Sequence, residues 1–197
     1  MSSSIHSSVV MYATALPMAV DGTVAREAPP PFPELFRTYT PYVWRLLRRL
    51  GVAERDVADL AQDVFLTVHT HLDRFEGRSH IRTWIYGICV NRARDYLRLA
   101  RVRRELPTDE LPDRHEDASQ DRDLDKKNAL KRLDAMLSRL DDEKRTVFVL
   151  FDVESMPMED VARVMDCPLQ TAYSRLYAAR SELKSMADAQ RMKEVRV

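Results

Sequence analysis

The sequence predicts an all-α protein of two small helical domains joined by a flexible acidic linker. Apolar residues recur at three- and four-residue spacing along most of the chain, and no stretch alternates with the period of a β-strand. Only 4 of the 197 residues are glycine, which disfavours a turn-rich β protein. A polar stretch without periodicity interrupts the helical pattern after residue 104, which indicates two separate domains.

The N-terminal segment is rich in serine and then in alanine and proline, so it is expected to be a disordered extension. Helical periodicity begins at Glu34, and Gly51 ends the first helix. Gly77 indicates a loop before the last helix of this domain. The helices of the first domain are expected at about 34–50, 54–73 and 80–101.

The second domain begins where the helical pattern resumes, at Asn128. Asp141, Asp142 and Glu143 predict a helix start, because acidic side chains favour the positive end of a helix dipole. Near the C-terminus a short helix over 158–165, a tight turn and a helix from Thr171 onward fit a helix-turn-helix, although a merely packing αα-hairpin would look similar. The predicted division is an extension (1–33), a first domain (34–104), an acidic linker (105–127), a second domain (128–187) and a tail (188–197).

The formal net charge is zero, with 31 basic and 31 acidic residues, but the charges are not evenly spread. Residues 74–104 hold nine arginines against two acidic residues, a net +7. Residues 105–125 hold nine acidic residues against two arginines, a net −7. Arginine binds phosphate in a bidentate way and stacks on bases, so the first block favours nucleic acid over a merely solvated helix face.

The arginine-rich helix has three distinct faces. Ile81, Trp84, Ile85 and Ile88 form an apolar face, with Trp84 expected in the core rather than as a DNA-melting wedge. A second row carries Asn91, which can read a base edge, followed by arginines that can hold phosphates. A third row, from Tyr86 to Leu97, is apolar enough to predict a second contact, either with a neighbouring helix or with unstacked bases.

These motifs together resemble the extracytoplasmic-function (ECF) sigma factors of bacterial RNA polymerase, within the sigma-70 family. The stretch DLAQDVFLTVHTHLDRFEGRSHIRTWIYGICVNRARDYLR (59–98) resembles region 2 of that family. The stretch LDDEKRTVFVLFDVESMPMEDVARVMDCPLQTAYSRLYAARSEL (140–183) resembles region 4. The resemblance covers nearly all of 34–185 in the family's order, and implies a promoter-specificity subunit that directs initiation, recognises −35 and −10 elements and assists promoter melting.

The resemblance also implies which residues meet each partner. The residues that would bind the clamp helices of the largest polymerase subunit are Asp59, Gln62, Asp63, Phe65 and Leu66, although Phe65 also fits an ordinary helix core. The residues that would capture a flipped −10 base or hold phosphates beside it are Phe75, Arg78, Tyr86, Asn91, Arg92, Arg94 and Arg98. The residues that would read or grip the −35 element are Thr171, Tyr173, Ser174, Arg175, Tyr177 and Arg180.

The chain departs from the family pattern in the second domain. The family often has basic residues where this chain has Tyr173 and Ala178, and a turn glycine where it has Gln170. The other implied partners are the flap of the second polymerase subunit, promoter DNA and an anti-sigma factor. The acidic linker would either mimic nucleic acid in a polymerase channel or act only as a solvated tether.

Other classes of function remain as alternatives with weaker support. A stand-alone helix-turn-helix regulator would bind duplex DNA without polymerase, but an acidic tether would repel bare DNA. No nucleophile elbow, P-loop or H-E-x-x-H pattern is present, and His69 and His71 lie on different sides of a helix, so no catalytic or metal site and no cofactor are expected. A helical adaptor is the fourth class. The sequence lacks a membrane span and a charged signal-peptide start, and Cys89 and Cys167 form no framework, so a cytoplasmic location is expected.

Overall fold

The computed structural model describes residues 29–77, 79–105 and 132–194. Within these ranges every regular element is a helix, which confirms the predicted all-α class. Most of the predicted extension and nearly all of the acidic linker lie outside the described residues, and the domain boundaries themselves stay a prediction.

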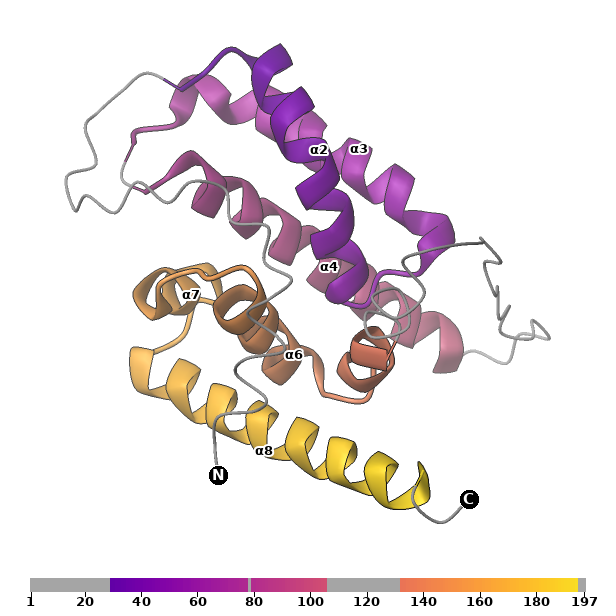
Figure 1. The fold of residues 1–197 in the computed structure, drawn as a ribbon. Helices are drawn as coiled ribbons and strands as arrows, with labels where there is room; N and C mark the ends of the chain where they lie inside the picture. The colour runs from indigo at the N-terminus through magenta and orange to yellow at the C-terminus, as the bar shows by residue number, and fades with distance from the viewer. Residues whose placement is uncertain (1–28, 78, 106–131, 195–197) are drawn as a thin grey trace, which may run out of the picture.

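The first half of the described chain consists of three helices that pack side by side (Figure 1). They are α2 (Phe32–Arg49), α3 (Glu54–His71) and α4 (Ile81–Glu105). Gly51 ends the α2 region as predicted, in a left-handed conformation with φ of 100°. Pro41 lies inside α2 without ending it, because Leu35 before it and Leu46 after it are anchored in the same core.

The second half contains α6 (Asp142–Phe148), α7 (Met158–Val164) and α8 (Leu169–Glu194). Asp141 caps α6 by accepting a hydrogen bond of 2.9 Å from the backbone N–H of Lys144. The chain continues from α6 into a π-helical turn at Val149–Val153, which leads to a loop around Ser155. This loop lies against α4 of the first half, where Glu154 bonds Arg82 and Tyr86.

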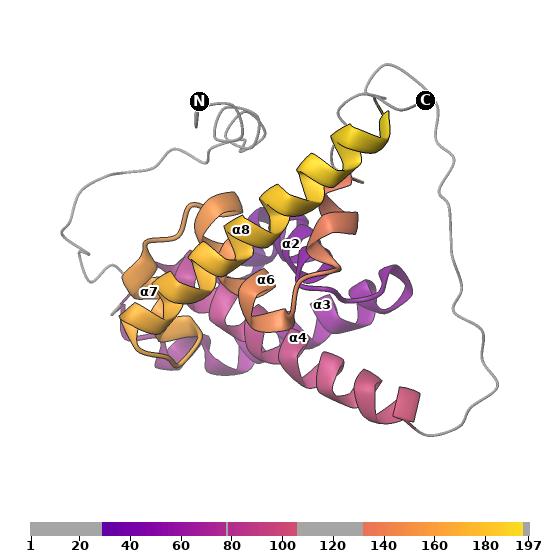
Figure 2. The same ribbon diagram turned by 90° about the horizontal axis from the view of Figure 1, so that it is seen from below.

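The two halves are in direct contact rather than separate in the described chain. Figure 1 shows α2, α3 and α4 above α6, α7 and α8, and Figure 2 shows α8 lying across the face opposite the first half. The core runs through both halves, with α4 packed against α7 as well as against α2 and α3. The apolar row on α4 is therefore covered by protein: Tyr86, Val90 and Ala93 are buried, and Leu97 is half-buried. Trp84, as predicted, packs against the core.

Candidate polymerase and nucleic-acid interfaces

The outer face of α3 presents four of the five predicted polymerase-binding residues to solvent. Asp59, Gln62, Asp63 and Leu66 are all exposed, and Leu66 is an apolar side chain with 57% of its surface accessible. They recur at spacings of three and four residues, so they form one continuous strip. An acidic strip around one exposed leucine is suited to bind a partner helix that carries basic and apolar side chains.

Phe65 does not belong to this exposed strip; it lies in the helix core, the alternative that the sequence left open for it, and its contact with polymerase stays a prediction. Its ring is buried, and it packs edge-on against Phe36 with 4.8 Å between ring centroids. Phe65 shares the inner face of α3 with Val57, Ala61, Val64 and Val68, which contact α2 and α4. The helical period alone explains the separation, because residues 65 and 66 lie about 100° apart around the helix axis.

The outward row of α4 carries the candidate −10 contacts. Asn91, Arg92, Arg94 and Arg98 are all exposed. Arg92 donates a hydrogen bond of 2.8 Å to the hydroxyl of Thr67, and Arg98 lies 3.4 Å from Asp95. Among the described residues, Asn91 and Arg94 have no side-chain hydrogen bond or ion pair, which leaves an amide and a guanidinium available to a ligand. Arg78, the remaining predicted arginine, lies outside the described residues.

The two aromatic residues predicted to hold a flipped base are not on this exposed row. Phe75 is half-buried beside Trp84, with 5.4 Å between ring centroids. Tyr86 is fully buried, and its hydroxyl donates a hydrogen bond of 2.9 Å to the carboxylate of Glu154. Burial raises the pKa of Tyr86, and the neighbouring carboxylate raises it further. In this conformation Tyr86 is not accessible to a base, because the loop of the second half covers it.

Glu154 is the centre of a polar cluster that joins the two halves, and we call Arg49, Arg82, Tyr86 and Glu154 the Glu154 cluster. Arg49 at the end of α2 lies 3.0 Å from one carboxylate oxygen of Glu154, and both side chains are more than four-fifths buried. Arg82 on α4 donates to the backbone carbonyl of Glu154. Close by, Thr83 donates to Asp160 over 3.3 Å. The cluster therefore pairs one partly buried carboxylate with cationic and hydroxyl donors from the opposite half.

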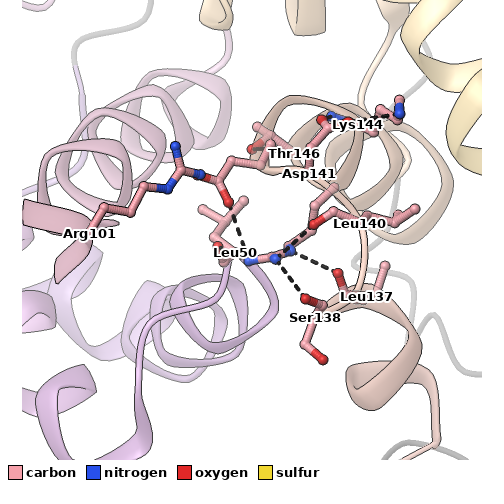
Figure 3. A network of polar contacts seen from close by, with 10 residues as sticks. Leu50, Arg101, Leu137, Ser138, Leu140, Asp141, Lys144 and Thr146 are labelled. Atoms are coloured by element: carbon pink, nitrogen blue, oxygen red, sulfur yellow. Dashed lines mark hydrogen bonds and ion pairs between the residues drawn. The ribbon is translucent and has the colours of Figure 1, made fainter. Parts of the chain in front are cut away.

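A second junction is built around Arg145 of α6. Its guanidinium is buried and donates to the carbonyls of Leu137, Ser138 and Leu140 within the second half. It also donates over 3.1 Å to the carbonyl of Leu50 in the first half, and Figure 3 shows these carbonyls converging. Burial lowers the pKa of Arg145, while the adjacent Asp142 opposes this shift.

Gly51 leaves the space in which the Arg145 guanidinium lies. A Cβ atom at residue 51 would come within 2.0 Å of Nη1 of Arg145. Glycine at residue 51 therefore serves two purposes. It adopts the positive φ of the turn after α2, and it leaves room for the Arg145 side chain of the second half. Arg101 of α4 also pairs with Asp142 of α6, which adds a third, more exposed link between the halves.

Sequence reasoning did not find the Glu154 cluster or the Arg145 junction. Arg145 lies three residues before the buried Phe148 on the same face of α6, and an arginine in phase with buried residues was a usable signal. Glu154 had no such signal, because it lies in a loop next to Ser155, whose φ is 55°. Only the packing of the two halves assigns a role to this carboxylate.

The helix-turn-helix forms as predicted, with α7 and α8 joined at 165–168. Tyr177 and Ser174 are exposed on α8, and Tyr173 and Thr171 are half-buried beside them. The rings of Tyr173 and Tyr177 stack with 6.5 Å between centroids, which forms a small aromatic surface. This surface is the candidate −35 contact.

Both arginines predicted to grip the −35 element have intramolecular partners in this structure. Arg175 pairs with Glu143 at 2.6 Å, and Arg180 donates to both carboxylate oxygens of Asp152 at 2.9 and 2.5 Å. Their contact with phosphates stays a prediction. The hydrogen bonds that Arg180 donates to Asp152 raise the pKa of Arg180. The turn position that favours glycine is Asp166, with φ of 51°, whereas Gln170 lies in the first turn of α8.

The described part of the chain contains no group of three or more histidine, cysteine, aspartate or glutamate residues arranged to hold a metal ion. His69 packs edge-on against Phe32, and His71 pairs with the carbonyl of Thr67. Cys89 is buried, burial raises the pKa of its thiol, and both cysteines are free thiols. Over the same described ranges, none of the helices has the length and apolarity that a membrane crossing requires.

Comparison with known protein families shows which class of protein has this arginine-rich helix together with a helix-turn-helix. Residues 35–103 match the family "Sigma-70 region 2", and residues 130–183 match "Sigma-70, region 4". The first match spans α2, α3 and α4, and the second spans α6, α7 and the first half of α8. The chain therefore combines the two sigma-70 regions on one polypeptide, in the predicted order.

The individual relatives narrow the class to one family. The chain is 32% identical over 146 residues to an ECF RNA polymerase sigma-E factor of Haemophilus influenzae, covering 68% of this chain and 76% of the relative. It is 31% identical over 148 residues to the factor of that name from Escherichia coli K12, covering 67% and 74%. The protein belongs to the ECF family of sigma-70-type sigma factors, and directs promoter-specific transcription initiation.

Solved structures agree with this assignment. A structure of CnrH in complex with the cytosolic domain of CnrY superposes with a TM-score of 0.60 at 26% identity, covering 80% of this chain and 88% of that one. The sigma factor RpoE from Bartonella quintana, solved with the anti-sigma factor NepR, gives a TM-score of 0.63 at 22% identity, covering 80% and 96%. At 22% identity, the similarity to RpoE shows a shared fold and nothing about function.

Proposed function

We propose that this sigma factor divides its work among three surfaces that are separate in the structure. The exposed strip of α3 binds the clamp helices of the largest polymerase subunit. The outward row of α4 recognises the −10 element, and the aromatic face of α8 recognises the −35 element while the second half docks on the flap of the second subunit. The protein has no catalytic site of its own and works in the cytoplasm, where promoter DNA and polymerase are found.

The observation that carries the −10 assignment is the pair Asn91 and Arg94. Both lie exposed on the arginine-rich helix, and neither has a side-chain partner among the described residues. An amide with one donor and one acceptor followed by a guanidinium one turn away suits a base edge next to a phosphate. The paired arginines Arg92 and Arg98 then hold neighbouring phosphates by exchanging their intramolecular partners.

The solved relatives support an anti-sigma partner. The RpoE structure contains the anti-sigma factor NepR, and the CnrH structure contains the cytosolic domain of CnrY. We propose that a partner of this kind controls the present chain. A neighbouring reading frame that encodes a small protein with one membrane span would be the expected candidate.

Run-off transcription with purified core polymerase tests the proposed function. The full chain is expected to direct core polymerase to defined start sites on genomic fragments, and core alone is not. Failure to initiate specifically at any genomic promoter would contradict the proposal. Tight, sequence-specific binding to duplex DNA by the free protein would instead support a stand-alone regulator.

A further inference from the structure

The first turns of α8 present a row of apolar side chains on the aromatic face of that helix. Leu169, Tyr173 and Tyr177 recur at four-residue spacing, which places them on one side of α8. Leu169 is 41% exposed and Tyr177 is 63% exposed, and Tyr173 lies half-buried between them. The two tyrosine rings stack with 25° between their planes. Figure 2 shows these turns of α8 beside α7, so the row belongs to the second helix of the helix-turn-helix.

The charged residues of the same turns both have carboxylate partners. Within residues 169–181 they are Arg175 and Arg180. Arg175 pairs with Glu143, and Arg180 pairs with Asp152. A protein reads guanine in the major groove mainly with arginine or lysine, which donate to O6 and N7 of the base. Because both guanidiniums are paired within the protein, this face is poorly equipped to read a G·C pair.

An exposed amide lies next to the apolar row. Gln170 is in the first turn of α8 and has no side-chain hydrogen bond among the described residues. A glutamine amide can bond N6 and N7 of adenine, and an apolar side chain can contact the C5-methyl group of thymine. In a helix-turn-helix, the residues that contact base edges lie at the start of the second helix. An amide beside an apolar row therefore matches both bases of an A·T pair.

We propose that this face of α8 reads A·T pairs of the −35 element, with Tyr173 and Tyr177 in contact with thymine methyl groups and Gln170 bonded to adenine. This inference rests on the proposed function, because it assumes that α8 meets the −35 element. It goes further by naming the base pairs that are read. The sequence preference at −35 then comes from apolar contact and one amide, and arginine does not supply it.

Removal of the thymine methyl groups tests the proposal directly. Deoxyuridine replaces thymidine throughout the −35 element of a promoter that is active in run-off transcription, and pairing with adenine is kept. Core polymerase carrying this chain is expected to bind the altered duplex about fourfold more weakly for each methyl group in contact. The control duplex carries deoxyuridine at the same number of positions in the spacer between the −35 and −10 elements. Equal affinity for the two duplexes would overturn the proposal.

Two substitutions of Tyr177 separate its ring from its hydroxyl group. Tyr177→Ala is expected to weaken binding of the unaltered promoter about fourfold and to reduce the effect of deoxyuridine, because a methyl contact is already missing. Tyr177→Phe keeps the ring and should behave like the unaltered chain with both duplexes. An undiminished deoxyuridine effect in Tyr177→Ala, or equal losses in the two variants, would contradict methyl contact by the ring.

The base preference itself is measured by transcription from a promoter library with every base pair at each −35 position. The unaltered chain is expected to select A·T pairs, and Gln170→Ala is expected to relax the preference at one of these positions. Selection of G·C pairs throughout the element by the unaltered chain would overturn the proposal. An unchanged preference in Gln170→Ala would remove the role assigned to the amide.

The outcomes also separate this inference from the proposed function. If polymerase carrying this chain initiates at no promoter, the proposed function fails and this inference fails with it. If initiation requires the −35 element but deoxyuridine is tolerated there, only this inference fails. A Tyr177→Ala variant that binds core polymerase more weakly without DNA, and keeps the full deoxyuridine effect, would assign the apolar row to a protein contact instead.

Discussion

Asn91 is the residue whose role is most sharply defined by its surroundings. Its amide is exposed on α4 and has no side-chain partner among the described residues, so its removal should not disturb the fold. The carbonyl and amino groups are suited to one base edge. The neighbouring arginines supply affinity that does not depend on sequence.

Asn91→Ala is expected to change the preferred base in the −10 element and to leave affinity for core polymerase unchanged. Transcription from a set of promoters with every base at each −10 position measures the preference, and a competition assay for core measures the affinity. A fall in core affinity with an unchanged base preference would show that Asn91 contacts polymerase instead.

Asp141 is a second residue with a separable role, at the N-terminus of α6. Burial opposes ionisation of its carboxyl, but the hydrogen bonds and charge of Lys144 outweigh burial and lower the pKa of Asp141 below its usual value. Because the folded-state pKa is depressed, the stabilisation by the carboxylate is complete above about pH 4 and is lost as pH falls through the folded-state value.

Asp141→Ala is expected to lower the free energy of unfolding by about 1 kcal/mol at pH 7, the typical cost of losing an N-cap. The difference from the unaltered protein should shrink near pH 3. Asp141→Asn retains a capping oxygen and should lose much less at pH 7. Urea unfolding at the two pH values measures all three proteins, and a cost that is independent of pH would contradict the charge contribution.

At the scale of elements, α3 shows how one helix serves two surfaces. Its inner face supplies Val57, Phe65 and Val68 to the core, and its outer face presents the acidic strip with Leu66. Because the faces are separated by the helical period, substitutions one residue apart should have opposite consequences. This makes α3 the clearest place to separate folding from polymerase binding.

Leu66→Lys is expected to leave the melting temperature nearly unchanged and to weaken core binding at least tenfold, because it places a charge in a contact that would bury an apolar side chain. Phe65→Ala is expected to cost about 3–4 kcal/mol of stability, as large-to-small changes in a core do. Thermal unfolding and a core-binding assay measure both effects. Weakened binding only in proportion to lost stability would argue against the α3 interface.

α4 differs from α3 because it is buried on two sides. The face with Ile85 and Cys89 is buried, and the row with Tyr86 and Val90 is also buried. The sequence left open whether that second row contacts a helix or unstacked bases. In this structure it is covered by protein.

On the scale of the whole molecule, Arg145 connects elements that are far apart in the chain. Its guanidinium donates hydrogen bonds to carbonyls in both halves. The acceptors are Leu137 and Leu140 in the second half and Leu50, just after α2, in the first half. Loss of this group leaves several buried acceptors without a donor, and each such acceptor is costly. A lysine cannot replace it, because an ammonium lacks the planar set of donors.

Arg145→Leu and Arg145→Lys are both expected to lower the free energy of unfolding by about 3 kcal/mol, the size typical of a broken buried polar network. Gly51→Ala should destabilise the same junction, since its Cβ would occupy the guanidinium site at a positive φ. Urea denaturation measures each change. A near-neutral Arg145→Lys variant would show that one donated bond, rather than the whole set, stabilises the junction.

The zero net charge of the chain is partly explained by ion pairs between the two halves. Arg101 of the basic segment pairs with the carboxylate of Asp142 in the second half, and Arg82 donates to the backbone carbonyl of Glu154. Charges that cancel in the total are thus partly paired across the contact. Promoter binding by Arg82 and Arg101 of α4 would compete with these internal partners.

The sequence by itself determined the helical class, the order of the elements and the exposed row of α4, because each depends on local periodicity and on residue types within a few turns. The family resemblance, confirmed by the two region matches, added the function. Local information also sufficed for Gly51, whose backbone conformation depends on the adjacent turn.

Only the tertiary structure decided which candidate residues are free to act. Phe65, Tyr86, Arg175 and Arg180 had suitable chemistry in the sequence, but burial or ion pairing engages each of them elsewhere. Their partners are distant in the chain: Tyr86 meets Glu154 across 68 residues, and Arg145 meets Leu50 across 95. No periodic pattern encodes such a pairing, because it depends on how two independently amphipathic halves pack against each other.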